Sequence, residues 1–298
     1  MSTGRVTGAV SLPGLDVSIQ RPGLYVVATP IGNLGDLTMR GAAVLAAVDV
    51  ILSEDTRHSR RLLDHYGIAT PLEALHEHNE DARSDGLVRR LRERRQAAAL
   101  ISDAGTPLIS DPGYVLVRAA RAAGLGIYTV PGPCAAIAAL SVSGLPTDRF
   151  VFEGFLPGQT QARATRLAAL AGETRTLVFY EAPHRIEETV ADLAAELEPG
   201  RTLVIARELT KLFESIVDLP LAEAAAWLAA DADRCRGEFV LCVSAPPPAE
   251  GIDQAAARVL DLLLAELPLK QAVKLAAEIS GASKNALYDL ALEKRRED

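Results

Sequence analysis

The chain has 298 residues, of which 49% are hydrophobic and 23% charged, so it can bury a sizeable core and exceeds the length that one core usually organises. Its formal net charge of -8 argues against a simple electrostatic nucleic-acid binder, because phosphate neutralisation normally leaves a basic footprint. Three scattered cysteines, without metal-ligand spacing, suit a reducing compartment. No signal peptide and no membrane helix is apparent. We therefore expect a cytoplasmic protein of two or three domains, with no membrane contact and with residues 1–22 as a flexible extension.

Short apolar runs alternate with helical patterns in the first part of the chain. The strand candidates are Leu24 to Ala28, Val48 to Leu52, Ala97 to Ile101 and Ile127 to Val130. This alternation predicts an α/β domain over residues 23–133, with largely parallel strands that are covered by helices.

A second α/β series begins after the break at Gly144–Asp148 and predicts another domain over residues 134–245. Its strand candidates are Phe150 to Glu153, Thr176 to Tyr180, Thr202 to Ala206, Ser215 to Leu219 and Glu238 to Ser244. The third and fourth are too close for a crossover helix between them. We therefore expect this pair to be antiparallel and the sheet to be mixed.

The end of the chain, residues 252–298, reads as a small helical module that follows a stiff, proline-rich linker at residues 245–251. Helical patterns cover residues 253–266, 269–279 and 283–292, and Ser283 is a candidate cap for the last of them. The pattern resembles a helix-turn-helix, although a dimerising or packing tail fits equally well. Possible phosphate contacts on it are Lys270, Lys274 and Lys284.

Two loops that follow predicted strands are candidate ligand sites, because α/β proteins bind small molecules at such loops. Residues 29–38 contain two glycines that permit close backbone approach, or else form a simple turn with Thr38 as a helix cap. Residues 130–136 are small, and Cys134 among them reads as a buried residue rather than a nucleophile. Neither the dinucleotide fingerprint nor a P-loop is present in the chain.

The loop at residues 102–113 is the most informative, since it holds two aspartates, two glycines and two prolines directly after a buried strand. Such a segment presents fixed backbone groups to a ligand. Its end also predicts a helix that Asp111 caps, with Pro112 in the first helical position.

Together the loops carry a specific resemblance. The motifs are TPIGNLGDLT (29–38), SEDTR (53–57), SDAGTPLISDPG (102–113), PGPCAA (131–136), GFLP (154–157), FYEAPHR (179–185) and RELTK (207–211). In order and spacing they resemble the bacterial 16S rRNA (cytidine-2'-O)-methyltransferase family, from about Leu24 to Ser244. That family is similar to the tetrapyrrole methylases.

The resemblance implies an α/β, tetrapyrrole-methylase-like fold: two α/β domains with the cofactor cleft between them, plus a small C-terminal helical module. It implies an S-adenosylmethionine-dependent enzyme that methylates the ribose 2'-oxygen of a decoding-centre cytidine in 16S rRNA of the small ribosomal subunit. It also implies a homodimer. No metal is expected.

The resemblance further implies roles for individual residues. The cofactor would be lined by Pro30, Asp103, Ala104, Gly105, Thr106, Leu108, Pro131, Gly132, Cys134, Ala135, Tyr180 and Ala206. Methyl transfer to a hydroxyl requires a base. The candidates for it are Glu181, His184, Glu208 and Lys211. The candidates for RNA phosphate binding are Arg57, Arg60, Arg185 and Arg207.

Two alternatives remain open from the residues. A tetrapyrrole methyltransferase would share the fold and the cofactor, but the FYEAPHR and RELTK motifs and the helical tail weigh against it. A non-catalytic RNA-binding or ribosome-assembly module would not need the cofactor. In SEDTR, the acidic Glu54 and Asp55 would either bind a ribose hydroxyl or cap the helix at Thr56, and capping is favoured.

Overall fold

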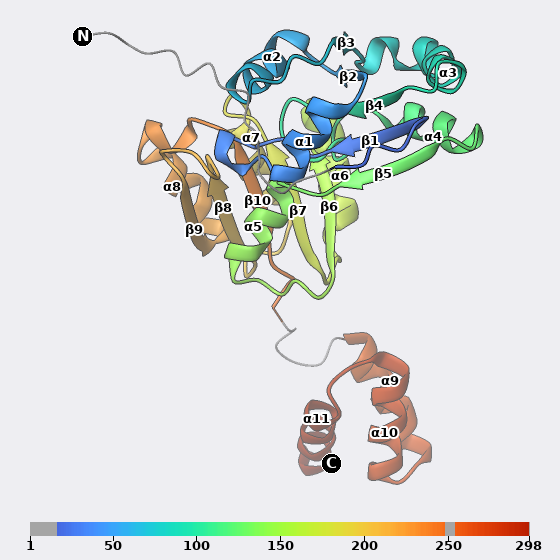
Figure 1. Cartoon of the computed structure of the whole chain (residues 1–298). Helices are drawn as coiled ribbons and strands as arrows, with labels where there is room; N and C mark the ends of the chain where they lie inside the picture. The colour runs from blue at the N-terminus through green and yellow to red at the C-terminus, as the bar shows by residue number, and fades with distance from the viewer. Residues whose placement is uncertain (1–16, 248–253, 298) are drawn as a thin grey trace. The chain divides into compact units, whose positions relative to one another are not determined.

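The computed structural model describes residues 17–247 and 254–297, and the chain divides into two compact units, residues 1–245 and 246–298. The first unit contains two five-stranded sheets, each covered by helices (Figure 1).

The first sheet has the strand order β3-β2-β4-β1-β5, and all of its neighbouring strands are parallel, as predicted. Its strands are β1 (Gly23–Val27), β2 (Val50–Ser53), β3 (Leu72–Ala74), β4 (Ala97–Leu100) and β5 (Gly126–Val130). Strand β3 was not predicted.

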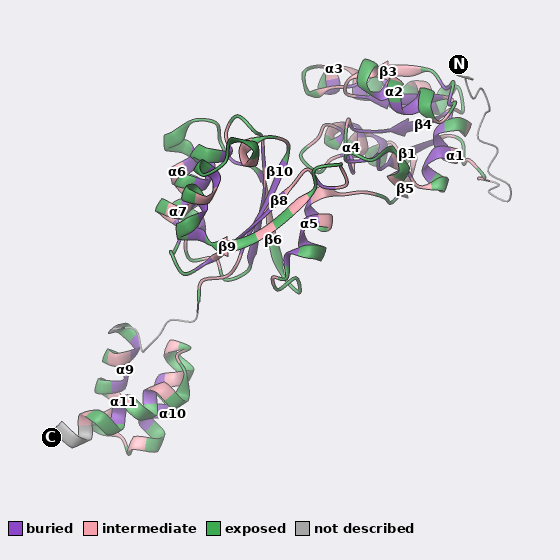
Figure 2. Cartoon of the chain, turned by 90° about the vertical axis from the view of Figure 1, so that its left-hand side faces the viewer, coloured by how far each residue is buried: buried purple, intermediate pink, exposed green. Residues whose placement is uncertain are grey.

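Helices cover both faces of the first sheet because its strands are apolar on both sides (Figure 2). One core joins alternate strand residues, such as Val27 and Ile51, to α1 (Met39–Ala47) and α2 (Thr56–His65). The other core joins the intervening strand residues to α3 and α4. Those two helices span Glu77–Glu93 and Tyr114–Ala122.

The second sheet has the order β6-β7-β10-β8-β9. Its strands are β6 (Phe150–Phe155), β7 (Thr176–Glu181), β8 (Thr202–Arg207), β9 (Ser215–Pro220) and β10 (Phe239–Val243). Strands β6 and β7 are parallel, and the other pairs, including β8 with β9, are antiparallel. The predicted mixed sheet is therefore confirmed.

One face of the second sheet packs against three helices. They are α6 (Thr160–Leu170), α7 (Ile186–Glu196) and α8 (Ala224–Ala229). The other face packs against α5 (Ala135–Ser143), whose Ala139 and Leu140 join Val178 and Val240 in a core. Ile31, from the loop after β1, belongs to the same core, so α5 lies where the two sheets of the first unit meet.

Part of the predicted N-terminal extension is attached to the first sheet. Val17 and Ile19 pack against its core, and Arg21 Nε lies 2.9 Å from Asp49 Oδ2. Residues 17–22 are therefore not loose, and residues 1–16 lie outside the described residues.

The second unit contains three helices with a core of their own, close to the predicted helical ranges. They are α9 (Gln254–Glu266), α10 (Leu269–Ser280) and α11 (Lys284–Glu297). Helix α10 ends at Ser280 and is followed by Gly281, whose φ of +74° places it in the left-handed region that glycine adopts readily. Of the predicted linker, residues 248–251 lie outside the described residues. No helix in the described ranges is long and apolar enough to cross a membrane.

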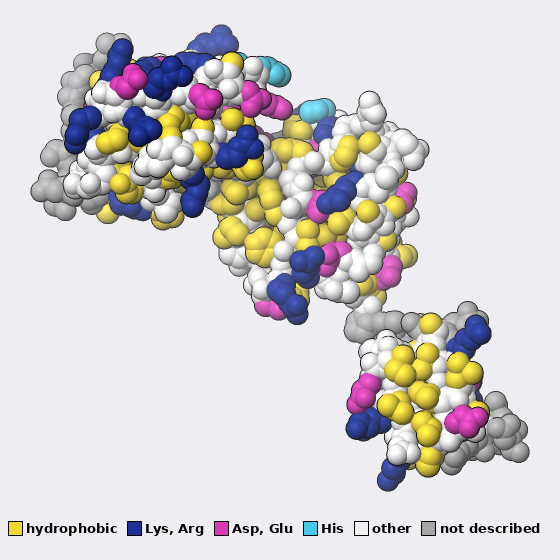
Figure 3. Space-filling view, turned by 90° about the vertical axis from the view of Figure 1, so that its right-hand side faces the viewer, with side chains coloured by type: hydrophobic (Ala, Val, Ile, Leu, Met, Phe, Trp, Pro, Cys, Tyr) yellow, Lys and Arg dark blue, Asp and Glu magenta, His cyan; other side chains and the backbone are white. Residues whose placement is uncertain are grey.

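Many arginines of the first unit are neutralised by neighbouring carboxylates. Arg83 and Arg90 both pair with Glu73, at 3.1 Å and 2.8 Å. The buried Arg163 pairs with Asp192 at 2.5 Å. On the face that Figure 3 shows, the Lys and Arg side chains of the first-sheet domain are scattered rather than gathered in one stripe.

Candidate active site

Three loops at the carboxyl edge of the first sheet are tied to one another. The backbone N–H of Thr29 donates to the Gly105 carbonyl at 2.8 Å, and the N–H of Gly105 donates back to Thr29 at 3.1 Å. The Thr106 hydroxyl donates to the Pro133 carbonyl at 2.9 Å. Gly105 has a φ of +83°, and a Cβ there would lie 3.3 Å from Ile31. The loops after β1, β4 and β5 thus form one rigid wall.

The opposite wall comes from the second sheet and is built around Tyr180 at the end of β7. Its hydroxyl accepts a hydrogen bond from Ala136 N at 3.1 Å, at the start of α5. The rings of Phe152 and Phe155 meet the Tyr180 ring edge-on, with centroids 5.0 Å and 5.6 Å away. Burial raises the pKa of the Tyr180 hydroxyl above its ordinary range, so it remains a neutral hydrogen-bonding group at physiological pH.

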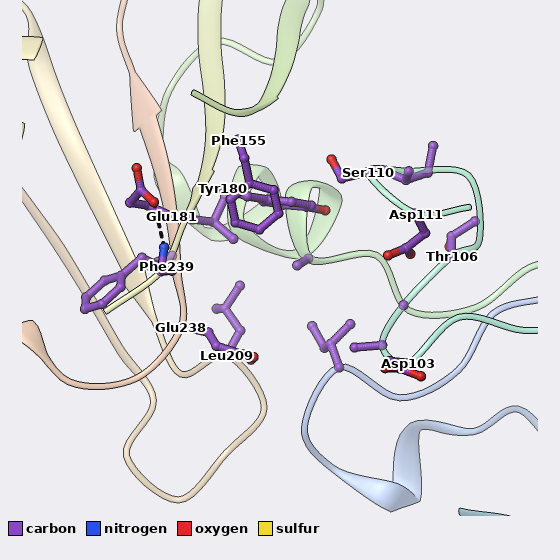
Figure 4. A pocket seen from close by; sticks show the side chains of 18 of the residues that line it. Asp103, Thr106, Ser110, Asp111, Phe155, Tyr180, Glu181, Leu209, Glu238 and Phe239 are labelled. Carbon is purple, nitrogen blue, oxygen red and sulfur yellow. Dashed lines mark hydrogen bonds between the residues drawn. The ribbon is translucent and has the colours of Figure 1, made fainter. Parts of the chain in front are cut away.

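Between these walls lies a cavity of about 300 Å³, at the lower end of the size range of ligand pockets (Figure 4). Its apolar lining includes Ile31, Ile109, Phe155 and Leu209. Its charged lining is mostly acidic and comprises Asp103, Asp111, Glu181, Lys211 and Glu238. A cavity of this kind suits a ligand with an apolar or aromatic part and a positive charge.

The structure brings seven of the predicted cofactor residues to this cavity and leaves five beside it. Those that line it are Asp103, Ala104, Gly105, Thr106, Ala135, Tyr180 and Ala206. Of the other five, Pro30 is buried, Leu108 packs against the first-sheet core, and Pro131 and Gly132 are exposed. Cys134 Sγ lies 4.0 Å from the Tyr180 hydroxyl.

Glu181, a predicted base candidate, has a fully buried side chain with its partners already in place. Its carboxylate accepts from the Thr189 hydroxyl at 2.5 Å and from its neighbour Ala182 N at 2.8 Å, and it lies 3.4 Å from Arg185 Nη2. This arrangement fixes the start of α7 and occupies the Glu181 carboxylate with contacts inside the fold.

Lys211 forms ion pairs with both Glu208 and Glu238. Lys211 Nζ lies 2.8 Å from Glu208 Oε1 and 2.8 Å from Glu238 Oε2. Burial alone would lower the pKa of Lys211, but the two carboxylates raise it. Burial would raise the pKa of Glu208, but the hydrogen bond from Lys211 lowers it. Lys211 is therefore a cation and Glu208 an anion at neutral pH. The fourth candidate, His184, is exposed and does not line the cavity.

The four predicted RNA-binding arginines differ in how far they are engaged. The Arg57 side chain is 93% exposed, and Arg60 is half-buried. Arg185 donates to the Leu156 carbonyl at 2.7 Å, and Arg207 donates to the Phe213 carbonyl at 3.3 Å. Arg57, whose Nε lies 3.8 Å from Asp55 Oδ1, keeps an exposed side chain that can reach a phosphate, whereas Arg185 is held within the fold.

The predicted helix caps can be compared directly with the structure. The Thr38 hydroxyl accepts from Gly41 N at 2.9 Å and caps α1. Asp55 accepts from Arg57 N at 2.7 Å and from His58 N at 3.3 Å, so it caps α2. The favoured capping interpretation of SEDTR is thereby confirmed for Asp55.

The prediction that Asp111 caps the next helix is wrong. Helix α4 begins at Tyr114, and the cap comes from Glu80 in α3, which accepts from Gly113 N at 3.1 Å and from Leu116 N at 2.9 Å. Asp111 lines the cavity instead. No local sequence signal separates these two roles, because the cap is supplied by a residue more than thirty positions earlier.

Asp111 has an unusual electrostatic environment. Burial raises its pKa to about 6, the nearby charges of Glu54 and Asp103 add to the shift, and the Ser102 hydroxyl opposes it. Among the described residues, no group of three or more His, Cys, Asp or Glu side chains could hold a metal ion.

Comparison with known proteins places the chain in a family. Residues 23–225 match the family model of the tetrapyrrole (corrin/porphyrin) methylases, and residues 250–295 match that of the RsmI C-terminal HTH domain. The ribosomal RNA small subunit methyltransferase I of Pseudomonas aeruginosa is 55% identical over 275 residues, covering 91% of this chain and 97% of the relative. The chain belongs to the ribosomal RNA small subunit methyltransferase I family. The Escherichia coli O157:H7 member is 52% identical over 91% of this chain and 95% of its own length.

Solved structures bear out the fold of this methyltransferase I family member. The methyltransferase CobJ has a TM-score of 0.55 at 22% identity, over 75% of this chain and 94% of that one. Diphthine synthase has a TM-score of 0.56 at 14% identity, over 74% and 89%. The chain therefore has the tetrapyrrole-methylase fold, and its family is S-adenosylmethionine-dependent.

The cavity residues fit S-adenosylmethionine. The sulfonium and ammonium groups of the cofactor are cationic, which suits a lining whose charged groups are mostly acidic, Asp103 among them. The adenosine part is aromatic, which suits Phe155 and Tyr180.

Proposed function

We propose that this protein transfers a methyl group from S-adenosylmethionine to the ribose 2'-oxygen of a decoding-centre cytidine in 16S rRNA, acting on the small ribosomal subunit in the cytoplasm. One observation carries the proposal: 55% identity along almost the whole chain with a relative named as a ribosomal RNA small subunit methyltransferase. The acidic and aromatic cavity supports it, because a module without catalysis would not need a site suited to this cofactor.

When bound, S-adenosylmethionine supplies a methyl group activated by its sulfonium centre. We assign the cofactor contacts to the backbone of residues 103–106 and to the side chains of Asp103, Tyr180 and Ala206. The hydrogen bonds between the three loops support this assignment, because they fix the backbone before a ligand arrives and lower the entropy cost of binding.

The decisive experiment is transfer of labelled methyl from S-adenosylmethionine to small ribosomal subunits that lack the modification, followed by nuclease mapping. A single 2'-O-methylated cytidine in 16S rRNA is the expected result. Naked 16S rRNA, assayed in parallel, tests whether the assembled subunit is required. Tight cofactor binding without transfer to either substrate would instead favour a small-molecule acceptor such as a tetrapyrrole.

We assign a phosphate contact to Arg57 at the start of α2. Arg57→Ala should weaken binding to the small subunit about 3- to 10-fold and leave the Kd for S-adenosylmethionine unchanged, because a phosphate contact positions RNA without touching the cofactor. Arg121→Ala, which removes an exposed arginine of α4, is the matched control. Equal RNA affinity of the wild type and the Arg57 variant would contradict the assignment.

We also infer that the protein is a homodimer through an apolar surface on the second sheet. Ile137 and Val142 of α5 are 53% and 51% exposed, and in the β8–β9 hairpin Leu212 and Phe213 are 89% and 69% exposed. Helix α5 contacts β9, which is the second strand of this hairpin. Exposed apolar clusters on soluble proteins commonly mark interaction sites.

Light scattering after size-exclusion chromatography tests the dimer. We expect the wild type to elute as a dimer and Ile137→Glu with Val142→Glu as a folded monomer. Thr165→Glu, on the exposed part of α6, should remain dimeric. A monomeric wild type at micromolar concentration would overturn this inference.

A further inference from the structure

Asp111 and Tyr180 face the same cavity from opposite walls. Figure 4 shows the Asp111 carboxyl directed from the loop after β4 into the space toward which the Tyr180 hydroxyl points from β7. Asp111 is thus a titratable group next to the space that a ligand of this cavity would occupy.

The other charged groups of the cavity are engaged elsewhere. The Glu181 carboxylate accepts hydrogen bonds from the Thr189 hydroxyl and from Ala182 N. Glu238 and Lys211 form an ion pair with each other. Asp103 accepts a hydrogen bond from Asp55 N at 3.2 Å. Each of these side chains already has a structural partner.

Asp111 differs because the Ser102 hydroxyl, which lowers its pKa, leaves one of its two carboxyl oxygens without a partner. Among the described residues it forms no ion pair, and its Oδ2 atom is buried without a hydrogen-bond partner. A buried carboxyl oxygen without a donor costs free energy, so it persists where a ligand or a reaction uses it.

The backbone around Asp111 is held in an uncommon conformation. Leu108 and Ser110 have φ values of +73° and +66°, in a region that side-chain-bearing residues rarely adopt, and Gly113 has a φ of +126°. The hydrogen bond from Gly113 N to the Glu80 carboxylate anchors the end of this segment. Such strain is concentrated at functional sites, where it fixes a side chain in place.

We propose that the Asp111 carboxylate is the general base that accepts the proton of the ribose 2'-hydroxyl during methyl transfer. This inference rests on the proposed function. The ribose oxygen forms a bond to the methyl carbon while the carbon–sulfur bond breaks. Sulfur keeps that electron pair, so the sulfonium becomes a neutral thioether. The hydroxyl proton passes to Asp111 and then to solvent, and no further reactant is needed.

The titration of Asp111 supports this role. Its pKa of about 6 lies close to physiological pH, where a base combines a large ionised fraction with useful proton affinity. The titratable and charged groups around it are Glu54, Glu80, Asp103, Cys134, Tyr180, Lys211 and Glu238. Burial and the charge of Asp103 also raise the pKa of Glu54. A pH profile must therefore distinguish the titration of Glu54 from that of Asp111.

The test compares Asp111→Asn, Glu54→Gln and Asp85→Asn in the full-length protein. Methyl transfer to unmodified small subunits is measured from pH 5 to 8.5, and the Kd for S-adenosylmethionine is measured by calorimetry. We expect Asp111→Asn to lower kcat about 100-fold or more, to lose the acid limb of the pH profile, and to change the Kd less than about 5-fold. Asp85, exposed on α3, should be silent, and Glu54→Gln should keep the acid limb.

Three results would overturn the proposal. They are a wild-type rate in Asp111→Asn, an acid limb that disappears in Glu54→Gln instead, and a loss of activity explained entirely by weaker cofactor binding. Methyl transfer by the wild type tests the proposed function independently of the role of Asp111. If the wild type does not methylate ribose at all, the proposed function itself is wrong.

Discussion

Asp111 also affects stability, because folding changes its pKa. Burial favours its protonated form, so the ionised carboxylate opposes folding at high pH. Asp111 does not lower the free energy of unfolding below about pH 4, the pKa of its carboxyl in the unfolded chain. Stability is lost as pH rises from there through about 6, the pKa in the folded protein. A residue at position 111 that cannot ionise should not lose stability in this pH range.

Asp111→Asn should therefore be more stable than the wild type at pH 8, by at most about 3 kcal/mol, and by only about half as much at pH 5. Urea unfolding at both pH values measures the difference. Asp85→Asn, an exposed control, should show no such pH dependence. A stability difference for Asp111→Asn that is equal at both pH values would contradict the electrostatic explanation.

At the scale of elements, the loop between β8 and β9 contacts the loop after β1 and holds it in place. Asn33 N donates to the Thr210 hydroxyl at 3.1 Å, and a Cβ at Gly32 would lie 2.5 Å from Lys211 Cγ. Glu208 and Thr210 have φ values of +51° and +68°, so the ion pairs of Lys211 hold a strained turn against the first sheet.

Gly32→Ala should displace Lys211 and weaken S-adenosylmethionine binding about 10-fold, because the loop after β1 contributes Ile31 to the cavity. Gly172→Ala is the matched control, since a Cβ there meets nothing within 4 Å. Calorimetric titration of both variants gives the comparison. An unchanged Kd in Gly32→Ala would mean that the contact between these loops does not shape the cavity.

The sequence predicts those parts of the fold that are determined within one segment of the chain. The apolar runs that became β1, β4 and β7 lie within their own segments and were readable. Strand β3 was missed because it has three residues, all half-buried, and one of them is Glu73, which pairs with α3. The sequence does not predict the role of Asp111 for a related reason: the cap of α4 comes from Glu80, which belongs to another helix. Signals that depend on contacts between distant segments cannot be read from one of them.

At the scale of the whole molecule, the charge distribution predicts how RNA binding responds to salt. The net charge is -8, and arginines such as Arg83, Arg90 and Arg163 are paired internally. These pairs and the net negative charge reduce the number of cations that can displace counterions from phosphates. Binding should therefore depend on the shape of the assembled subunit more than on counterion release.

The slope of log affinity for the small subunit against log salt concentration should be shallower than about -4 between 50 and 200 mM KCl. Filter binding at a series of salt concentrations measures it. The same measurement on Arg57→Ala should give a slope shallower by about 1. A wild-type slope near -8 would show that the protein uses many more phosphate contacts than its surface charges indicate.

The strand order of the second sheet has a consequence for biosynthesis. Strand β10 lies between β7 and β8, yet it is the last strand of the chain to be made. Until residues 239–243 leave the ribosome, the backbone groups on one edge of β7 and of β8 have no partner, and unpaired edges favour aggregation. A nascent chain truncated before residue 239 should therefore depend on chaperones, whereas one that extends past residue 245 can close the sheet by itself.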